Sequence, residues 1–245
     1  MEEGVIDMVR AAGGEVYAIT SEPQHLADQA HEHWELSFEN IGDPHQEISK
    51  TCSERGWLTL YANRGELEFL QRGADWNIEH PKGFFQPGVL ALTNKHRVLY
   101  RWRSVPSAEN LNGTSMRPTA THAWQKIESA LTAGEAAGDA LHDDNPVVDQ
   151  GPPPRLVFFA ALIANGWFLK ARSFMYSPGA ESIPSRFKTA MSRWLIFLLF
   201  WIICLSIVPG GLVALAFAGW FTWIVLDLRR VMRDMDNQVE LKVNE

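Results

Sequence analysis

Cysteine is scarce in this chain, which has Cys52 and Cys204 among its 245 residues. Two cysteines so far apart form neither a disulfide framework nor the paired spacing of a zinc site. The chain also lacks a phosphate-binding glycine motif and the Gly-x-Ser-x-Gly turn of many hydrolases. The usual sequence signatures of nucleotide-binding and serine-hydrolase enzymes are therefore missing.

Positive charge is in the minority, because 22 lysines and arginines stand against 29 aspartates and glutamates, a net charge of −7. Residues 1–185 carry 15 basic and 24 acidic side chains, whereas residues 186–245 carry seven basic and five acidic ones. An acidic domain with a slightly basic C-terminal region argues against nucleic-acid binding. The N-terminus shows no pattern of a cleavable signal peptide.

The strongest positive feature is Trp194–Leu226, a run of 33 residues without a charge. One straight span needs about 20 residues, so the run is too long for one helix and short for two. Pro209-Gly210-Gly211 in its middle predicts a helical hairpin that either crosses a membrane thinly or dips in from one face. A buried hairpin in a soluble protein is the alternative. Basic side chains flank both ends of the run and favour the cytoplasmic side for both: Arg186, Lys188, Arg193, Arg229, Arg230 and Arg233.

A weaker apolar segment, Leu156–Leu169, precedes this run. Its 14 residues include Asn165 and favour an interfacial or packed helix over a membrane span. We therefore expect an integral membrane protein whose Trp194–Leu226 contacts the lipid bilayer and whose soluble domain is cytoplasmic. The expected parts are a domain at 1–141, a Pro/Asp-rich linker at 142–154, an amphipathic segment at 155–193, a transmembrane hairpin at 194–226 and a tail at 227–245.

Helix and strand patterns alternate in the N-terminal domain. The helix signals are the spacing of Val5–Ala12 before two glycines, a capping-box pattern at Ser21 and Gln24, Asp43 before a first-turn proline, and Thr121. The strand patterns are Glu15–Thr20, Trp34–Phe38, Trp57–Ala62, Glu66–Leu70 and the hairpin Gln86–Trp102. Alternating helices and strands predict an α/β fold in which helices cover a sheet.

The second strand of the hairpin has two different faces. Val98, Tyr100 and Trp102 share one face. Arg97, Leu99, Arg101 and Arg103 share the other, and its three arginines are a candidate binding face for a partner protein or for lipid. The alternative is a solvated face in which Arg97 or Arg101 pairs with Glu66 and Glu68, which contributes little to stability.

Four segments in this order resemble the thioredoxin-like fold, and more narrowly the peroxiredoxin-like branch of the alkyl hydroperoxide reductase/thiol-specific antioxidant family. They are Gly13–Glu22, Trp34–Pro44, Gln86–Trp102 and Asn112–Ile127. In that family a cis-proline precedes the third core strand and faces the redox site, and the resemblance assigns this place to Pro87, with Gln86 before it. It implies a protein of thiol redox and antioxidant ancestry. The hairpin alone also resembles one of bacterial pleckstrin-homology-like domains, which the helices between the early strands fit less well.

Thiol chemistry in the peroxiredoxin-like family begins at a cysteine after the first core strand, where a helix N-terminus lowers the thiol pKa. That strand and its cysteine loop have no counterpart here. Cys52 lies near the end of a different helix and is expected to be a buried residue, a weak candidate nucleophile. We therefore expect no peroxidase or disulfide reductase activity; an active chain would need a thiol reductant as partner.

Two further expectations complete the functional hypothesis. His25, His31 and His33 are interpreted as a solvated helix end, so no metal or cofactor is expected. The alternative function, from a different class, is a membrane-anchored binding or scaffold module without catalysis.

Overall fold

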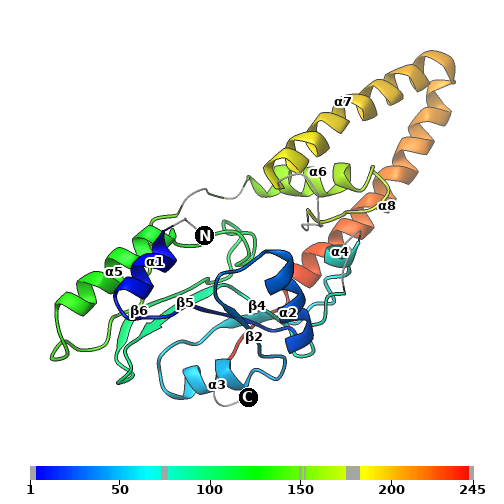
Figure 1. Ribbon diagram of the computed structural model, residues 1–245. Helices are drawn as coiled ribbons and strands as arrows, with labels where there is room; N and C mark the ends of the chain where they lie inside the picture. Colours follow the sequence, from blue (N-terminus) through cyan, green and yellow to red (C-terminus); the bar gives the residue numbers. More distant parts are fainter. Residues whose placement is uncertain (1–3, 73–76, 149–150, 152, 175–182, 243–245) are drawn as a thin grey trace. The chain divides into compact units, whose positions relative to one another are not determined.

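The computed structural model describes residues 4–72, 77–148, 151, 153–174 and 183–242 (Figure 1). The chain divides into two compact units. Unit 1 comprises Met1–Arg64, Ile78–Pro152 and Gln238–Glu245, and unit 2 comprises Gly65–Asn77 and Pro153–Asn237. The structure therefore divides the chain differently from the sequence-based boundaries, because residues 65–77 join the C-terminal helices and the C-terminal residues join the α/β unit.

The described strands of unit 1 form three small sheets. Strand β1 (Tyr17–Thr20) pairs in parallel with β2 (Glu39–Gly42). Strand β3 (Tyr61–Asn63) lies antiparallel between β4 (Phe84–Phe85) and β7 (Gln238–Glu240). The hairpin consists of β5 (Gly88–Leu92) and β6 (Val98–Arg103). An α/β unit is thus present, but its described strands do not join into the single sheet that the thioredoxin-like resemblance implies.

Helices cover these sheets on the faces that the apolar side chains select. Helix α5 (Ala120–Thr132) packs on β6, where Tyr100, Trp102 and Ala123 form a buried cluster. Val98, Tyr100 and Trp102, which share one face of β6, are 0%, 3% and 6% exposed, and Leu99 on the other face is buried as well. Helix α1 (Val5–Ala11) lies beside α5, and α2 (Gln24–His33) packs on β2 (Figure 1).

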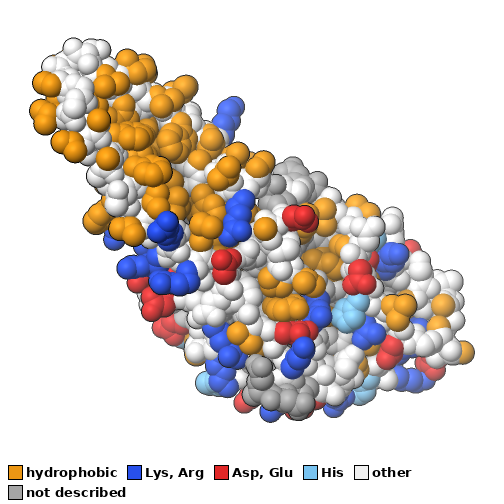
Figure 2. Space-filling model, turned by 180° about the vertical axis from the view of Figure 1, so that it is seen from behind, with side chains coloured by type: hydrophobic (Ala, Val, Ile, Leu, Met, Phe, Trp, Pro, Cys, Tyr) orange, Lys and Arg blue, Asp and Glu red, His pale blue; other side chains and the backbone are white. Residues whose placement is uncertain are grey.

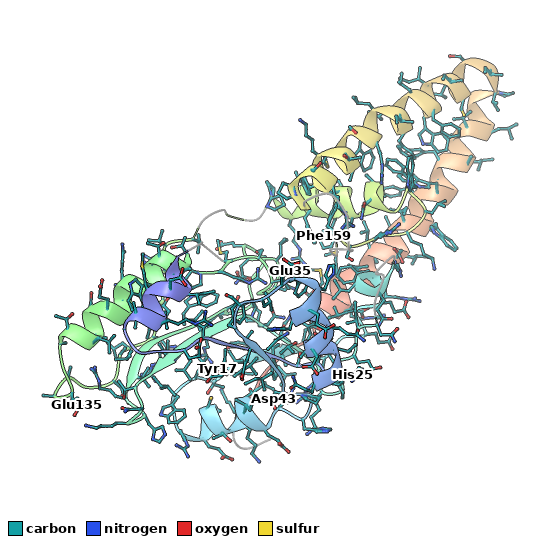
Figure 3. All side chains as sticks on the ribbon, in the orientation of Figure 1. Tyr17, His25, Glu35, Asp43, Glu135 and Phe159 are labelled. Carbon is teal, nitrogen blue, oxygen red and sulfur yellow. The ribbon has the colours of Figure 1, made fainter. Side chains whose placement is uncertain are left out.

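The position of each helix start depends on which side chain can reach the free backbone N–H groups. Asp43 caps α3 (Glu47–Glu54), because its carboxylate accepts hydrogen bonds from the N–H groups of Glu47, Ile48 and Ser49 at 2.7, 3.3 and 3.0 Å. Figure 3 labels Asp43 at this end of the helix. The Asp43 side chain thus binds the helix start as predicted, but the helix begins later, so that Gln46 is the residue before it and Pro44 is not in its first turn.

Two other predicted caps are wrong. Thr119, and not Thr121, caps α5, because its hydroxyl accepts a hydrogen bond from the N–H of His122 at 3.1 Å. Ser21 does not cap α2, whose first residue follows Pro23 without a side-chain cap. The Ser21 hydroxyl bonds instead to residues far along the chain.

Three of the predicted strands differ in the structure. Trp34–Phe38 is irregular; Trp34 is 47% exposed and β2 begins only at Glu39. Within Trp57–Ala62 the strand begins at Tyr61. Glu66–Leu70 overlaps the short helix α4 (Glu68–Gln71), which belongs to unit 2. Short alternating patterns do not separate strands from turns when tertiary contacts choose the backbone conformation.

The segment predicted as a linker is partly ordered along β6. The N–H of Asp143 donates to the carbonyl of Arg101 at 3.0 Å, and the N–H of Ala140 donates to that of Val98 at 2.9 Å. The N–H of Thr119 donates to the carbonyl of Val147 at 2.9 Å. These bonds occupy backbone groups that an edge strand would otherwise expose.

Unit 2 contains α4, α6 (Arg155–Asn165), α7 (Ile183–Ile207) and α8 (Gly210–Asp236). Helices α7 and α8 are antiparallel and joined by a tight turn at Val208 and Pro209 (Figure 1). The hairpin turn predicted at Pro209-Gly210-Gly211 is therefore confirmed. Proline has no N–H to continue α7, and its backbone geometry starts α8 instead.

Candidate functional site

The apolar surface of α7 and α8 is the largest functional candidate. By length and composition, Pro184–Ile207 and Gly210–Asp236 are the two helices among the described residues that are apolar enough to cross a membrane. Only 6% of the most apolar stretch of the first helix and 11% of that of the second are buried. Figure 2 shows the hydrophobic side chains gathered over this hairpin. So large an exposed apolar surface is compatible with lipid contact.

Helix α6 closes the base of the hairpin. It packs on α7, and its side chains Phe159, Leu162 and Ile163 are buried (Figure 3 labels Phe159). The helix ends at Gly166, after which Trp167 and Phe168 adopt left-handed φ angles of 53° and 63°. The apolar segment before the hairpin is therefore a packed helix of 11 residues followed by a turn.

Tryptophans of the hairpin hold this turn in place. The indole N–H groups of Trp220 and Trp223 donate to the carbonyls of Phe168 and Leu169, both at 2.7 Å. The indole of Trp194 donates to the carbonyl of Ala160 at 3.1 Å. These three Trp side chains thus contact a single stretch of chain, from α6 to the turn after it.

Arg193 satisfies the C-terminal end of α6. Its guanidinium donates to the carbonyls of Ala164 and Asn165 at 3.1 and 3.2 Å, which are free acceptors at a helix end. The same guanidinium lies 4.2 Å from the centre of the Trp167 ring, a cation–π contact. A cation and an amphipathic ring are thus placed together where the apolar surface begins.

An ion pair fixes Arg72, the residue after α4, to α8. Arg72 donates to Asp227 at 3.1 Å and to the carbonyl of Ala171 at 2.9 Å, and the N–H of Ala171 donates to Asp227 at 2.8 Å. Both charged side chains are largely buried, at 19% and 11% exposure. The further hydrogen bonds of each charge offset part of the cost of burying the pair. Sequence reasoning missed it, since 155 positions separate the partners.

The residues assigned by resemblance to a redox site have other roles in the fold. No described peptide bond is cis, so the cis-proline expected at Pro87 is not found. Pro87 lies between β4, which pairs with β3, and β5, which pairs with β6. Its carbonyl accepts a hydrogen bond from the N–H of Ser104 at 2.8 Å. A residue without an N–H suits this change of partner strand.

Gln86 is almost completely buried, at 1% exposure. Its N–H donates to the carbonyl of Tyr61 at 2.8 Å, while its side-chain amide packs on Gly113 without a protein hydrogen-bond partner. A Cβ atom at Gly113 would lie 2.7 Å from the amide oxygen, so this glycine, with φ at 97°, permits the contact. Gln86 is an interior residue and does not present a surface.

The three arginines predicted as a binding face donate to carbonyl groups of their own unit. Arg97 bonds to Ala130, and Arg101 to Gly56, at 2.9 and 2.8 Å. Arg103 bonds to Thr59 at 2.9 Å and pairs with Glu240 at 2.6 Å. The glutamate partner comes from β7, and the expected pairing with Glu66 and Glu68 is not among the described ion pairs of these arginines.

Cys52 lies in α3 and is half-buried. Burial raises the pKa of its thiol, nearby Asp43 raises it further, and Arg55 opposes the change in part. A thiol with a raised pKa forms little of the reactive thiolate at neutral pH. His25, His31 and His33, interpreted from the sequence as a solvated helix end, lie in α2. Among the described residues, no three potential metal ligands lie together.

Sequence reasoning missed a buried cluster of Ser21, His80 and Glu22. The Ser21 hydroxyl lies 2.8 Å from His80 Nδ1 and accepts a hydrogen bond from the N–H of Phe85 at 3.1 Å. Burial lowers the pKa of His80 to about 4, and burial raises the pKa of Glu22, whose carboxylate is 4.0 Å from His80 Nε2. The imidazole is therefore neutral at neutral pH. The bonds from Ser21 join the end of β1 to β4 and to the segment before it.

A second missed cluster joins α5 to the segment beside β6. The Asp143 carboxylate accepts hydrogen bonds from the Tyr100 hydroxyl at 3.0 Å and from His122 Nε2 at 2.7 Å. Burial favours a higher pKa for Asp143, but these bonds outweigh it and the pKa is lowered. Tyr100 and Asp143 are 43 positions apart and the three residues form no local motif, so only the fold brings them together.

Comparison of the chain with protein-family models, with curated proteins and with solved structures gave no match. The functional interpretation below therefore rests on the geometry of this chain.

Proposed function

We propose that this protein is a membrane-anchored α/β binding module that does not catalyse thiol chemistry. The observation that carries the proposal is the outward-facing apolar surface of α7 and α8. Only 6% of the most apolar stretch of α7 and 11% of that of α8 are buried. Transfer of apolar surface from water into lipid is favourable by about 25 cal/mol per Å². This hairpin gains little of that energy from its own fold, so a bilayer is its natural environment.

The state of the cysteines argues against a thiol enzyme. The pKa of Cys52 is raised, which is opposite to the shift that activates a nucleophilic thiol. Cys204 lies within the apolar part of α7. The resemblance to the peroxiredoxin-like family then supports a proposal about ancestry only. The same proposal includes a thioredoxin-like origin of the fold of the α/β unit.

The charge of unit 1 indicates what such a module binds. Its segments carry 12 basic and 22 acidic side chains, a net charge of −10. Several of its arginines, including Arg101 and Arg103, are already bonded within the unit. An anionic surface attracts a cationic protein partner and repels nucleic acid and anionic lipid. We place this acidic unit in the cytoplasm, because basic side chains flank both ends of the hairpin.

The test compares the full chain with charge insertions in membrane fractionation. The unmodified protein should stay in the membrane pellet after washes with high salt and alkaline carbonate. The double variant Ile203→Arg/Leu215→Arg, at sites 56% and 71% exposed, should be released, since each arginine in hydrocarbon costs about 2.5–3.5 kcal/mol. The matched control Leu141→Arg, at an 84% exposed site in unit 1, should remain in the pellet.

Release of the unmodified protein by salt would refute the anchoring. A peroxide-consumption assay with a thiol reductant tests the other half of the proposal and should show no activity above buffer. Robust turnover that disappears in Cys52→Ser would make the protein a thiol peroxidase instead.

A further inference from the structure

We propose that α7 and α8 enter one leaflet and turn back inside the bilayer without crossing it. The inference rests on the proposed function, because it takes lipid as the environment of the hairpin. It follows from where the apolar surface begins on each helix and from how far each helix continues beyond that point.

The turn after α6 marks the outer limit of the hydrocarbon. Its backbone is irregular from Gly166 to Phe174, and Lys170 in the middle of it is exposed. An exposed ammonium group within the hydrocarbon is costly, so the Lys170 side chain lies in the headgroup layer or in water. This turn therefore lies at the level of the headgroups.

The tryptophans show which residues of α7 and α8 lie at the same depth as this turn. Trp220 and Trp223 of α8 donate to the turn itself, and the ring of Trp194 of α7 lies 4.9 Å from the ring of Phe168 in the turn. Indoles prefer the membrane interface, where the ring is apolar and the N–H is hydrogen-bonded. Asp227, bonded to Ala171 of the same turn, lies outside the hydrocarbon as well.

The helices beyond this level are too short to cross. Helix α7 continues from Leu195 to its last residue, Ile207, a length of about 20 Å at 1.5 Å per residue. Helix α8 runs from Gly210 to Gly219 before it reaches Trp220, a length of about 15 Å. The hydrocarbon core of a bilayer is about 30 Å thick. The turn of the hairpin therefore reaches the bilayer interior and not the opposite surface.

The chemistry of the hairpin tip agrees with this depth. The residues from Ile207 to Leu212 carry no charge, and these two side chains are 77% and 59% exposed. A tip in the opposite headgroup layer would place them in water. The hydroxyl of Ser206 donates to the carbonyl of Ile202 at 3.0 Å, so the polar side chain next to the tip is satisfied within its own helix.

Spin-label depth measurements on the full chain test the inference. A cysteine-free background (Cys52→Ser/Cys204→Ala) receives single cysteines at Leu199, Val208 and, as the aqueous control, Lys170, and is reconstituted into phosphatidylcholine vesicles. Relaxation by oxygen and by a water-soluble nickel complex reports the depth of each label. We expect depth to increase from Lys170 through Leu199 to Val208, with Val208 at least tenfold less accessible to nickel than Lys170.

Two results would overturn the inference and are distinct from each other. If the hairpin crosses the bilayer, Leu199 will be the deepest site and the label at Val208 will be accessible to nickel. That result would contradict the shallow insertion but would leave the anchoring intact. Failure of the protein to float with the vesicles would remove the proposed function itself. In that case a shielded Val208 would mean that a second copy of the chain covers the hairpin.

Discussion

At the scale of single residues, the imidazole of His80 links folding to pH. Its folded-state pKa is about 4, below the ordinary value of 6.5, because burial disfavours the charged form. The unfolded state therefore binds more protons between these two values, and stability present above pH 6.5 is lost as the pH falls toward 4. The full loss is about 3 kcal/mol.

The comparison variant for this prediction is His80→Asn, which keeps an acceptor for the Ser21 hydroxyl but does not titrate. Thermal unfolding of the full chain in neutral detergent, followed by circular dichroism from pH 7 to pH 4, should show a steeper decline for the unmodified protein than for the variant. Glu22 has a raised pKa and acts in the opposite direction in both proteins, so the difference isolates His80. Parallel declines would assign the acid sensitivity to other groups.

At the scale of elements, Asp43 determines where α3 begins. Replacing it with alanine leaves three N–H groups without their acceptor, at a cost of about 1–2 kcal/mol. Asp43→Asn keeps one acceptor oxygen and should lose about half as much. The matched control is Glu128→Ala on the exposed face of α5, for which no change above about 0.5 kcal/mol is expected.

Urea unfolding of the full chain, followed by the fluorescence change of unit 1, measures these differences in stability. Equal midpoints for Asp43→Ala and Glu128→Ala would show that α3 does not depend on this cap.

Elements of this kind were well predicted where a signal is local: the two-glycine stop after α1, the cap at Asp43 and the turn at Pro209 each act within a few residues.

At the scale of the whole molecule, β7 ties the end of the chain back to unit 1. Strand β7 pairs with β3, Arg103 pairs with Glu240 at 2.6 Å, and the N–H of Leu241 donates to the carbonyl of Leu60 at 2.8 Å. The chain therefore leaves unit 1 before the hairpin and returns to it afterwards. We therefore predict that both ends of the hairpin lie on the same side of the membrane.

Single cysteines at Glu135 and Lys242, which are 73% and 67% exposed, test this topology. In the cysteine-free background, a membrane-impermeant maleimide should label neither site in intact cells and both sites after permeabilisation. Labelling of one site alone in intact cells would mean that the hairpin ends are on opposite sides. Labelling of both would keep the shared side but move it out of the cytoplasm.

The sequence by itself determined the features that depend on neighbouring residues. The uncharged run with a central proline specified an apolar hairpin, and the two glycines after the first helical pattern specified where α1 ends. Only the tertiary structure decided which distant groups meet. It paired Arg72 with Asp227, Ser21 with His80 and β7 with β3, and it turned Glu66–Leu70 from an expected strand into part of a helix. These outcomes depend on burial and hydrogen bonding between segments far apart in the chain, which no short pattern encodes.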